Sequence, residues 1–256
     1  MILNEETWGN IPLLHIVEKE SEHKEIPVVI FLHGFTSAKE HNLHYAYTLA
    51  KKGLRVLLPD AHLHGVREEK LDEVELSLRF WEIVLTSIEE LALIRKELKN
   101  RNLLSSKKVG VAGTSMGGIT TLGALKMYEW IDTAAVMMGA PGFVELAKAQ
   151  INEFESEGFK LPVTKTERAK LFTDLAVFDI TKNQHVLNQR PLFFWHGKND
   201  PVVPYRPTFK FYEAVKADYI DVPDRLSFVT DKVAAHAVTR SGMLASVNWL
   251  ASHLKE

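Results

Sequence analysis

Short apolar runs alternate with longer helical patterns along most of this chain. These runs read as strands and lie at 11–19, 27–34, 54–60, 107–113, 133–141, 191–197 and 226–230. The run at 27–34 is continuously apolar, as expected of a strand buried on both faces of a sheet. The helical patterns lie at 39–53, 73–100, 116–129, 205–216 and 240–254. Because such alternation builds parallel βαβ units, the sequence predicts an α/β protein with a doubly wound, mostly parallel sheet of about eight strands.

Residues 142–189 depart from this alternation. They are more polar than the rest of the chain, helical in parts, and contain no clear strand pattern. A chain of 256 residues suits one sizeable α/β domain or two small ones, and 142–189 interrupt the sheet pattern without a strand pattern of their own. We therefore expect a single domain over 1–256, in which 142–189 form a helical cap inserted over the sheet.

The segment Gly113-Thr114-Ser115-Met116-Gly117 places a serine between glycines, after a predicted strand and before a predicted helix. A strand-to-helix turn this sharp strains the serine backbone and needs small neighbours, which Gly113 and Gly117 supply. The helix N-terminus also favours a negative charge nearby. A plain glycine-rich turn and a phosphate-binding loop are alternatives, but a phosphate-binding loop needs a lysine where Ile119 stands. The pattern favours a nucleophile elbow.

A serine hydroxyl becomes a nucleophile when a histidine takes its proton and an acid orients that histidine. In sheets of this kind the chain order is serine, acid, histidine. Asp200 follows the strand at 191–197, and His236 lies between the last strand and the last helix. Taken alone, Asp200 would also suit a turn before Pro201, and His236 would suit an ordinary loop. The common sheet edge and the order predict a catalytic set of Ser115, Asp200 and His236.

Six other aspartates are weaker candidates for the acid. Two lie in the predicted cap, three crowd the loop before the last strand, and one is close to His236 but has no recognisable motif. They are Asp174, Asp179, Asp218, Asp221, Asp224 and Asp231.

A serine acyl-transfer enzyme also needs donors for the oxyanion of its tetrahedral intermediate, and loss of one donor lowers the rate by about 10²–10³. The Met116 amide follows the nucleophile directly, and the Phe35 amide follows the strand that ends in Leu32-His33-Gly34. We expect these two amides to form the oxyanion hole. Gly34 is expected to let the backbone turn, so that the Phe35 amide points inward while its ring lines the acyl pocket or the core.

Four motifs together resemble the α/β-hydrolase fold: HGF at 33–35, GTSMGG at 113–118, HGKNDPVVP at 196–204 and the late His236. The group they resemble is the prolyl-oligopeptidase-like and dienelactone-hydrolase-like esterases of bacteria, over residues 10–254. The resemblance implies a triad of Ser115, Asp200 and His236, with Phe35 and Met116 at the oxyanion.

The chain departs from that group in two ways. Dienelactone hydrolases use a cysteine nucleophile, and this chain has no cysteine. The oligopeptidases carry a large additional domain that sieves peptides, for which these residues leave no room. An ester substrate therefore fits the resemblance better than a dienelactone or a peptide.

Five histidines, His33, His41, His44, His62 and His64, lie close together in the sequence. Histidine pairs can bind zinc, but no acidic ligand stands near them in a recognisable pattern. We expect no metal site here. Instead, His33 and His64 are expected to hydrogen-bond the loops around the nucleophile.

Composition excludes several other classes. Thirty-one basic residues against 33 acidic ones give a net charge of −2, which does not indicate nucleic-acid binding. The absence of cysteine excludes disulfides, zinc–thiolate sites and iron–sulfur clusters. The stretch MILNEETWGNIPLL lacks the basic and apolar regions of a signal peptide, and no apolar run approaches the roughly 18 residues of a membrane span. We expect a cytoplasmic protein with no membrane partner.

These observations predict a serine hydrolase that cleaves carboxylic esters of short to medium acyl chain through an acyl-enzyme, without a cofactor. Its partner would be a small-molecule ester, and it would act as a monomer or homodimer. A thioesterase, a lipase-like enzyme or a small peptidase with the same triad remains an alternative, because the cap would shape the pocket. A non-catalytic binding protein on the same fold is an alternative of another class.

Overall fold

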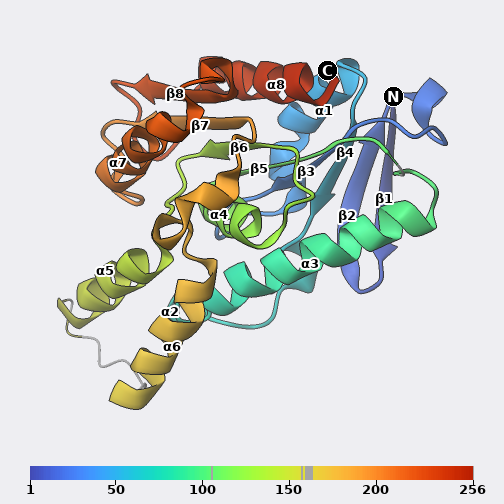
Figure 1. Cartoon of the computed structure of the whole chain (residues 1–256). Helices are drawn as coiled ribbons and strands as arrows, with labels where there is room; N and C mark the ends of the chain where they lie inside the picture. The colour runs from blue at the N-terminus through green and yellow to red at the C-terminus, as the bar shows by residue number, and fades with distance from the viewer. Residues whose placement is uncertain (105, 157, 159–163, 256) are drawn as a thin grey trace.

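The computed structural model describes residues 1–104, 106–156, 158 and 164–255, and a central sheet of eight strands runs through this part of the chain (Figure 1). In chain order the strands are β1 (Ile2–Trp8), β2 (Ile11–Val17), β3 (Val28–Leu32), β4 (Arg55–Pro59), β5 (Val109–Thr114), β6 (Thr133–Met137), β7 (Leu192–Gly197) and β8 (Leu226–Asp231). Their order in the sheet is β1-β2-β4-β3-β5-β6-β7-β8.

All strands from β4 to β8 in this order pair in parallel, and only β1 and β2 join antiparallel. The register pairs Leu32 with Gly113, at the ends of β3 and β5, and Gly197 with Asp231, at the ends of β7 and β8. The loops that follow these strands therefore leave one edge of the sheet. This arrangement confirms the predicted doubly wound, mostly parallel sheet.

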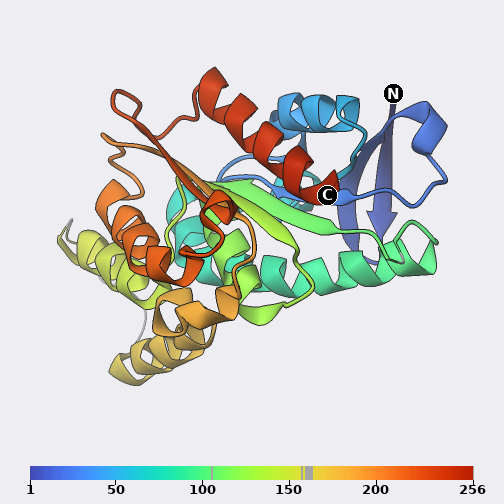
Figure 2. The ribbon, with the colours of Figure 1, turned by 45° about the horizontal axis from the view of Figure 1, so that its top comes forward.

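Helices cover both faces of the sheet, which explains why its inner strands are continuously apolar. One core packs α1 (Leu43–Lys51) and α8 (Arg240–Lys255) against Val29 and Phe31 of β3. The other packs α3 (Phe80–Asn100) and α4 (Met116–Met127) against Val28 and Ile30 of the same strand. Figure 2 shows α8 crossing in front of the sheet, with α3 behind it.

The helical pattern at 73–100 was expected to form one helix, and the structure divides it. Asp72 caps a short α2 (Glu73–Leu78) through a capping box with Glu75, and Arg79 then takes φ −95° and ψ 6° before α3 begins. Val74 is 39% exposed, whereas Trp81 is only 8% exposed. The apolar periodicity therefore continues across the break, but only the second helix buries its apolar face.

Between β6 and β7 the described residues form α5 (Phe143–Ser156), α6 (Lys165–Phe178) and two short 3-10 turns, with no strand. Residues 157 and 159–163 of the predicted cap lie outside the described residues. Figure 1 shows both helices projecting away from the sheet. The two helices are joined where they meet the rest of the domain. There the buried Asp179 carboxylate, at the end of α6, accepts the amide of Val144 at the start of α5 at 3.1 Å.

The remaining helix, α7 (Tyr205–Val215), follows β7 and packs against the core that contains α3 and α4. In the described part of the chain we find no helix with the length and hydropathy needed to cross a membrane.

Candidate active site

Ser115 stands between β5 and α4 with φ 54° and ψ −117°, a backbone conformation that side chains rarely adopt. Its two glycine neighbours make the turn possible. A Cβ on Gly113 would lie 2.4 Å from the Gly117 carbonyl carbon, and one on Gly117 would lie 2.2 Å from the Leu32 carbonyl oxygen. The elbow therefore packs directly on the end of β3, and only glycine fits at both positions.

Gly34 does not have the role that the sequence suggested. A Cβ at Gly34 would find ordinary van der Waals spacing, 3.5 Å from the Thr114 carbonyl oxygen, and the left-handed φ of this loop falls on Thr36 at 57° instead. The backbone turn that follows β3 is therefore held by contacts around Thr36, not by the freedom of a glycine.

The structure brings Ser115, His236 and Asp200 together. The Ser115 hydroxyl lies 2.8 Å from His236 Nε2, and His236 Nδ1 lies 2.7 Å from Asp200 Oδ2. The three side chains come from the loops after β5, β7 and β8, at the same sheet edge. The imidazole can therefore accept the serine proton on one side while the carboxylate accepts the Nδ1 proton on the other.

Asp200 is buried and held by its own loop. Its Oδ1 accepts the amides of Val202 and Val203, each at 2.9 Å. The fully buried His196 places Nε2 3.4 Å from Oδ2 and hydrogen-bonds the Val203 carbonyl at 2.9 Å. Burial lowers the pKa of His196, which keeps this ring neutral. The remaining carboxylate oxygen is thereby aimed at His236.

The other six aspartates lie elsewhere. Asp231 accepts the Val233 and Ala234 amides at 3.0 and 2.9 Å, and these hydrogen bonds lower its pKa and shape the loop that carries His236. Asp179 closes the base of α5 and α6, and Asp174 pairs with Lys170 on the surface. The three aspartates before β8 are exposed: Asp218, Asp221 and Asp224.

Two backbone amides stand beside the elbow. Met116 is the first residue of α4, and Phe35 follows β3, the strand next to β5. Among the hydrogen bonds of the described residues, neither amide has a protein partner. Phe35 lines the same cavity as Ser115, and an oxyanion formed at Ser115 would need backbone donors of this kind.

The five neighbouring histidines have separate partners. His41 hydrogen-bonds Ser37 at 3.0 Å, His62 lies 3.3 Å from Glu82, and His44 packs on the Tyr45 ring. His33 and His64 are buried and accept backbone amides from each other's loop. Within the described residues no group of three metal-ligating side chains comes together.

A buried ion pair beside these loops was not foreseen from the sequence. The Lys39 ammonium lies 2.8 Å from Asp60 Oδ2, and Asp60 Oδ1 accepts the Lys39 amide at 2.9 Å. Although burial alone lowers the pKa of Lys39, its hydrogen bonds to Asp60 and Glu40 raise it overall. From the sequence, Asp60 stood out only as a residue at the end of a predicted strand. Lys39 gave no signal of burial, because it falls in a segment whose pattern suits a helix.

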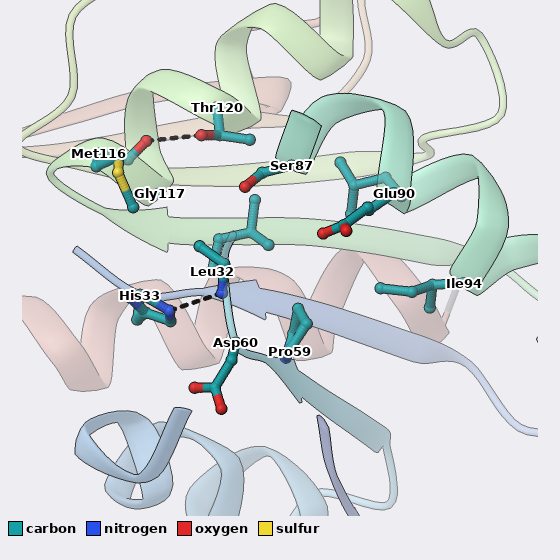
Figure 3. Close-up of a pocket in the computed structure, with 12 residues that line it drawn as sticks. Leu32, His33, Pro59, Asp60, Ser87, Glu90, Ile94, Met116, Gly117 and Thr120 are labelled. Atoms are coloured by element: carbon teal, nitrogen blue, oxygen red, sulfur yellow. Dashed lines mark hydrogen bonds between the residues drawn. The ribbon is translucent and has the colours of Figure 1, made fainter. Parts of the chain in front are cut away.

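A small cavity of about 10 Å³ lies behind the elbow, between α3 and the first turn of α4. Figure 3 shows the Ser87 hydroxyl and the Glu90 carboxylate on the α3 side, with His33 and Asp60 on the side of β3 and β4. The Glu90 carboxylate is paired with both terminal nitrogens of Arg67, at 2.7 and 2.9 Å. A space of this size accommodates one water molecule, so it is no substrate site.

A second cavity, of about 700 Å³, opens at Ser115. The rings of Phe35, Phe80 and Trp81 form one part of its lining, with centroid distances of 5.5 Å and 5.2 Å between successive rings. Further apolar lining comes from α4, α5 and α6: Ile119, Leu146, Ile151, Phe154 and Leu171. This volume is in the range of pockets that bind a drug-sized ligand.

Polar groups are few in this cavity and most are paired. The Trp81 indole donates to Gln150 Oε1 at 2.9 Å and so links α3 to α5. Arg168 is hydrogen-bonded to Glu155. Three carboxylates also line the cavity, Glu82, Glu153 and Glu167. The lining therefore carries more negative than positive charge.

Because His33 is buried, the free energy of unfolding should depend on pH, and measuring that dependence tests the position of His33 in the site. Burial lowers the pKa of His33 from 6.5 to about 4, so the unfolded chain binds this proton at a higher pH than the folded protein. The stability present above about pH 6.5 should fall by up to about 3 kcal/mol as the pH drops to about 4.

Urea unfolding at about pH 7 and about pH 4.5 measures this loss. A His33→Gln variant, whose amide oxygen can still accept the Ala61 amide but does not titrate, should lose less stability between the two pH values than the wild type. An equal loss in both proteins would contradict the assignment.

A doubly wound sheet whose loops place a serine elbow, a histidine and an aspartate at one edge defines an α/β hydrolase. The comparison with protein families agrees. The model of the prolyl oligopeptidase family matches residues 43–255, and the chain belongs to this family.

Two relatives match nearly the whole chain. YitV of Bacillus subtilis is 46% identical over 252 residues, which cover 98% of this chain and 99% of that protein. Esterase YjfP of Escherichia coli is 31% identical over 246 residues, which cover 96% of each. The predicted resemblance to this group of hydrolases is confirmed.

Solved structures with lower identity share the fold. TT1662 from Thermus thermophilus superposes with a TM-score of 0.76 at 20% identity, covering 100% of this chain and 98% of that one. The Pyrococcus furiosus esterase Pf2001 gives 0.67 at 22% identity, covering 99% and 92%. Est1E from Butyrivibrio proteoclasticus, solved with ferulic acid bound, gives 0.66 at 16% identity and covers both chains fully.

Proposed function

We propose that this protein is a serine esterase that hydrolyses carboxylic esters through an acyl-enzyme on Ser115. The observation that carries the proposal is the continuous chain of hydrogen bonds from Ser115 through His236 to Asp200, at the opening of an apolar cavity. Its relative YjfP, itself named an esterase, supports ester hydrolysis over the other reactions of this fold.

The proposed reaction has two halves. The Ser115 hydroxyl attacks the ester carbonyl carbon while His236 Nε2 takes its proton, and the Phe35 and Met116 amides stabilise the resulting oxyanion. When the tetrahedral intermediate collapses, His236 gives the proton to the leaving alcohol. Water then attacks the acyl-enzyme, again losing a proton to His236, and the carboxylic acid departs as Ser115 recovers its proton.

The cavity limits the substrate. We propose that 142–189 act as a cap within one domain, because α5 and α6 supply much of the cavity lining. The apolar walls of the cavity suit an acyl chain of short to medium length, and its excess of carboxylates disfavours a substrate that ends in a negative charge.

We also propose a cytoplasmic location for a monomer or homodimer, in keeping with the absence of cysteine from all 256 residues.

A series of p-nitrophenyl esters from acetate to octanoate tests this function. Because each buried methylene contributes about 0.8 kcal/mol, kcat/KM should rise by up to about fourfold per methylene until the cavity is filled. The half-ester of adipate, an acyl chain that ends in a carboxylate, should react at least about tenfold more slowly than the hexanoate ester. Turnover of thioesters or amides with no hydrolysis of any ester would favour the thioesterase or peptidase alternative instead.

A further inference from the structure

The loops after β3 and β4 each contain a non-glycine residue with a left-handed backbone. Thr36 has φ 57° and Leu63 has φ 61°. Such a conformation is unusual for any side chain and is an outlier for one as bulky as leucine, which here is also buried. Strained positions of this kind persist only where the surroundings impose them, and they cluster at functional sites. In these two loops the surroundings include two histidines that hydrogen-bond backbone amides, one of them the amide of Thr36 itself.

Each of the two loops supplies a histidine that accepts an amide of the other. The Thr36 amide donates to His64 Nε2 at 3.0 Å, and the Ala61 amide donates to His33 Nε2 at 3.0 Å. We call these two reciprocal hydrogen bonds the histidine brace. Figure 3 shows the His33 bond as a dashed line that runs from the ring to a backbone nitrogen. Both histidines are buried, and their ring centroids are 5.3 Å apart.

The second nitrogen of each ring fixes its protonation. His33 Nδ1 donates to the Gly34 carbonyl at 2.7 Å, and His64 Nδ1 donates to the His62 carbonyl at 2.9 Å. Because Nε2 accepts in both rings, each imidazole is neutral with its proton on Nδ1. All four ring nitrogens therefore hold backbone atoms of these two loops.

The brace determines the direction of the Phe35 amide. The Gly34 carbonyl and the Phe35 N–H belong to one planar peptide, in which they point in opposite directions. By holding the Gly34 oxygen, His33 turns the Phe35 N–H away from itself. His64 holds the next amide, that of Thr36, and its ring meets the Phe35 ring edge to face at 5.4 Å. Phe35 is thus fixed on both sides along the chain.

We propose that the histidine brace, and His64 in particular, positions the Phe35 amide for the oxyanion before any substrate binds. The inference rests on the proposed function and adds to it a residue that touches neither substrate nor the reacting atoms. Donors aimed in advance at the developing charge are the largest single source of catalysis in such sites. His64 acts through the backbone of Phe35 and Thr36, so it is a positioning residue.

The brace holds only while both rings are neutral, because a protonated Nε2 would present a proton to the amide that it now accepts. Asp60, Glu68 and His62 face His64, and Asp60, His41 and His64 face His33. Burial outweighs the nearby carboxylates and lowers the pKa of both rings, that of His33 to about 4. The brace therefore stays closed at neutral pH and opens in acid.

Two variants at position 64 separate the parts of this arrangement. In His64→Gln the longer side chain can place its amide oxygen where Nε2 accepts the Thr36 amide. In His64→Asn the shorter side chain can place its amide nitrogen where Nδ1 donates, but it has no acceptor at the position of Nε2. We expect His64→Asn to lower kcat for a p-nitrophenyl ester by about 10²-fold with KM within about threefold, and His64→Gln to retain kcat within about fivefold. His23→Asn, at a side chain that is 89% exposed and outside both loops, is the matched control and should behave as the wild type.

Hydrogen exchange of the Thr36 amide, followed by NMR, provides a readout that does not depend on catalysis. Exchange should be slow in the wild type and in His64→Gln, and fast in His64→Asn. In the wild-type protein, nitrogen NMR of His64 should show the proton on Nδ1, a measurement that holds even if a variant fails to fold.

Equal kcat in the Asn and Gln variants, unchanged Thr36 exchange in His64→Asn, or a proton on His64 Nε2 would each overturn the inference. If the wild type hydrolysed no ester, the proposed function and the catalytic part of this inference would both fail. The exchange measurement would then still decide whether the brace itself exists.

Discussion

Replacing His236 with alanine is expected to lower kcat for ester hydrolysis by about 10⁴-fold or more, with KM changed by less than about tenfold. His236 Nε2 lies 2.8 Å from the Ser115 hydroxyl, so its loss leaves no base to take the serine proton. Substrate contacts in the cavity are retained, because they come from other side chains. Steady-state kinetics with a p-nitrophenyl ester measures both constants.

The double variant Ser115→Ala with His236→Ala tests whether the two residues act together. Residues that act as one unit show non-additive losses, so the double variant should be about as slow as either single variant. His23→Ala is the control, because that side chain is 89% exposed and lies next to the neighbouring Glu22 on the surface. A His236→Ala enzyme within tenfold of the wild type would contradict the proposed mechanism, as would a double variant slower than the singles by the product of their losses.

Replacing Gly117 with alanine is expected to destabilise the fold by more than about 4 kcal/mol, or to prevent folding. The added Cβ would lie 2.2 Å from the Leu32 carbonyl oxygen and 2.6 Å from its carbon, and both are backbone atoms of the central strand β3. Neither can move without disturbing the sheet and the loop that carries Phe35. Urea unfolding, or the yield of folded protein if none unfolds cooperatively, measures the effect.

Gly34→Ala is the matched control for this prediction. The nearest atom to its Cβ would lie 3.5 Å away, and the residue has no left-handed φ. We expect a change in the free energy of unfolding of less than about 1 kcal/mol. If Gly117→Ala proved as mild as Gly34→Ala, the elbow would not be packed on β3 as described.

Local sequence signals predicted the framework of the molecule well. The inner apolar strands are buried and spaced by helices, so their parallel order follows from general rules of α/β folds. Ser115 was predictable because a sharp elbow needs glycines at fixed positions around it. Asp200 and His236 were predicted from chain order, since both follow strands that end at the same edge as β5.

What the sequence could not supply is the contact between segments that are distant along the chain. From the sequence we expected Gly34 to make the turn after β3, but the left-handed residue there is Thr36. The sequence could not show this, because the hydrogen bond from Thr36 to His64 joins two loops that are distant along the chain. Lys39 lies in a helical pattern, yet it is buried against Asp60. The cavity is lined by helices α5 and α6, whose placement depends on the Trp81–Gln150 hydrogen bond and on the base at Asp179.

Labelling with a fluorophosphonate, followed by peptide mass mapping, tests most directly whether Ser115 is an activated nucleophile. The reagent phosphonylates a serine, with loss of fluoride, only where a base takes the serine proton and an oxyanion hole receives the phosphonyl oxygen. We expect one adduct per chain, on the peptide that contains Ser115, and none in the Ser115→Ala variant. An unlabelled wild-type protein, or an adduct that persists after Ser115 is replaced, would contradict the assignment of this residue and the esterase function built on it.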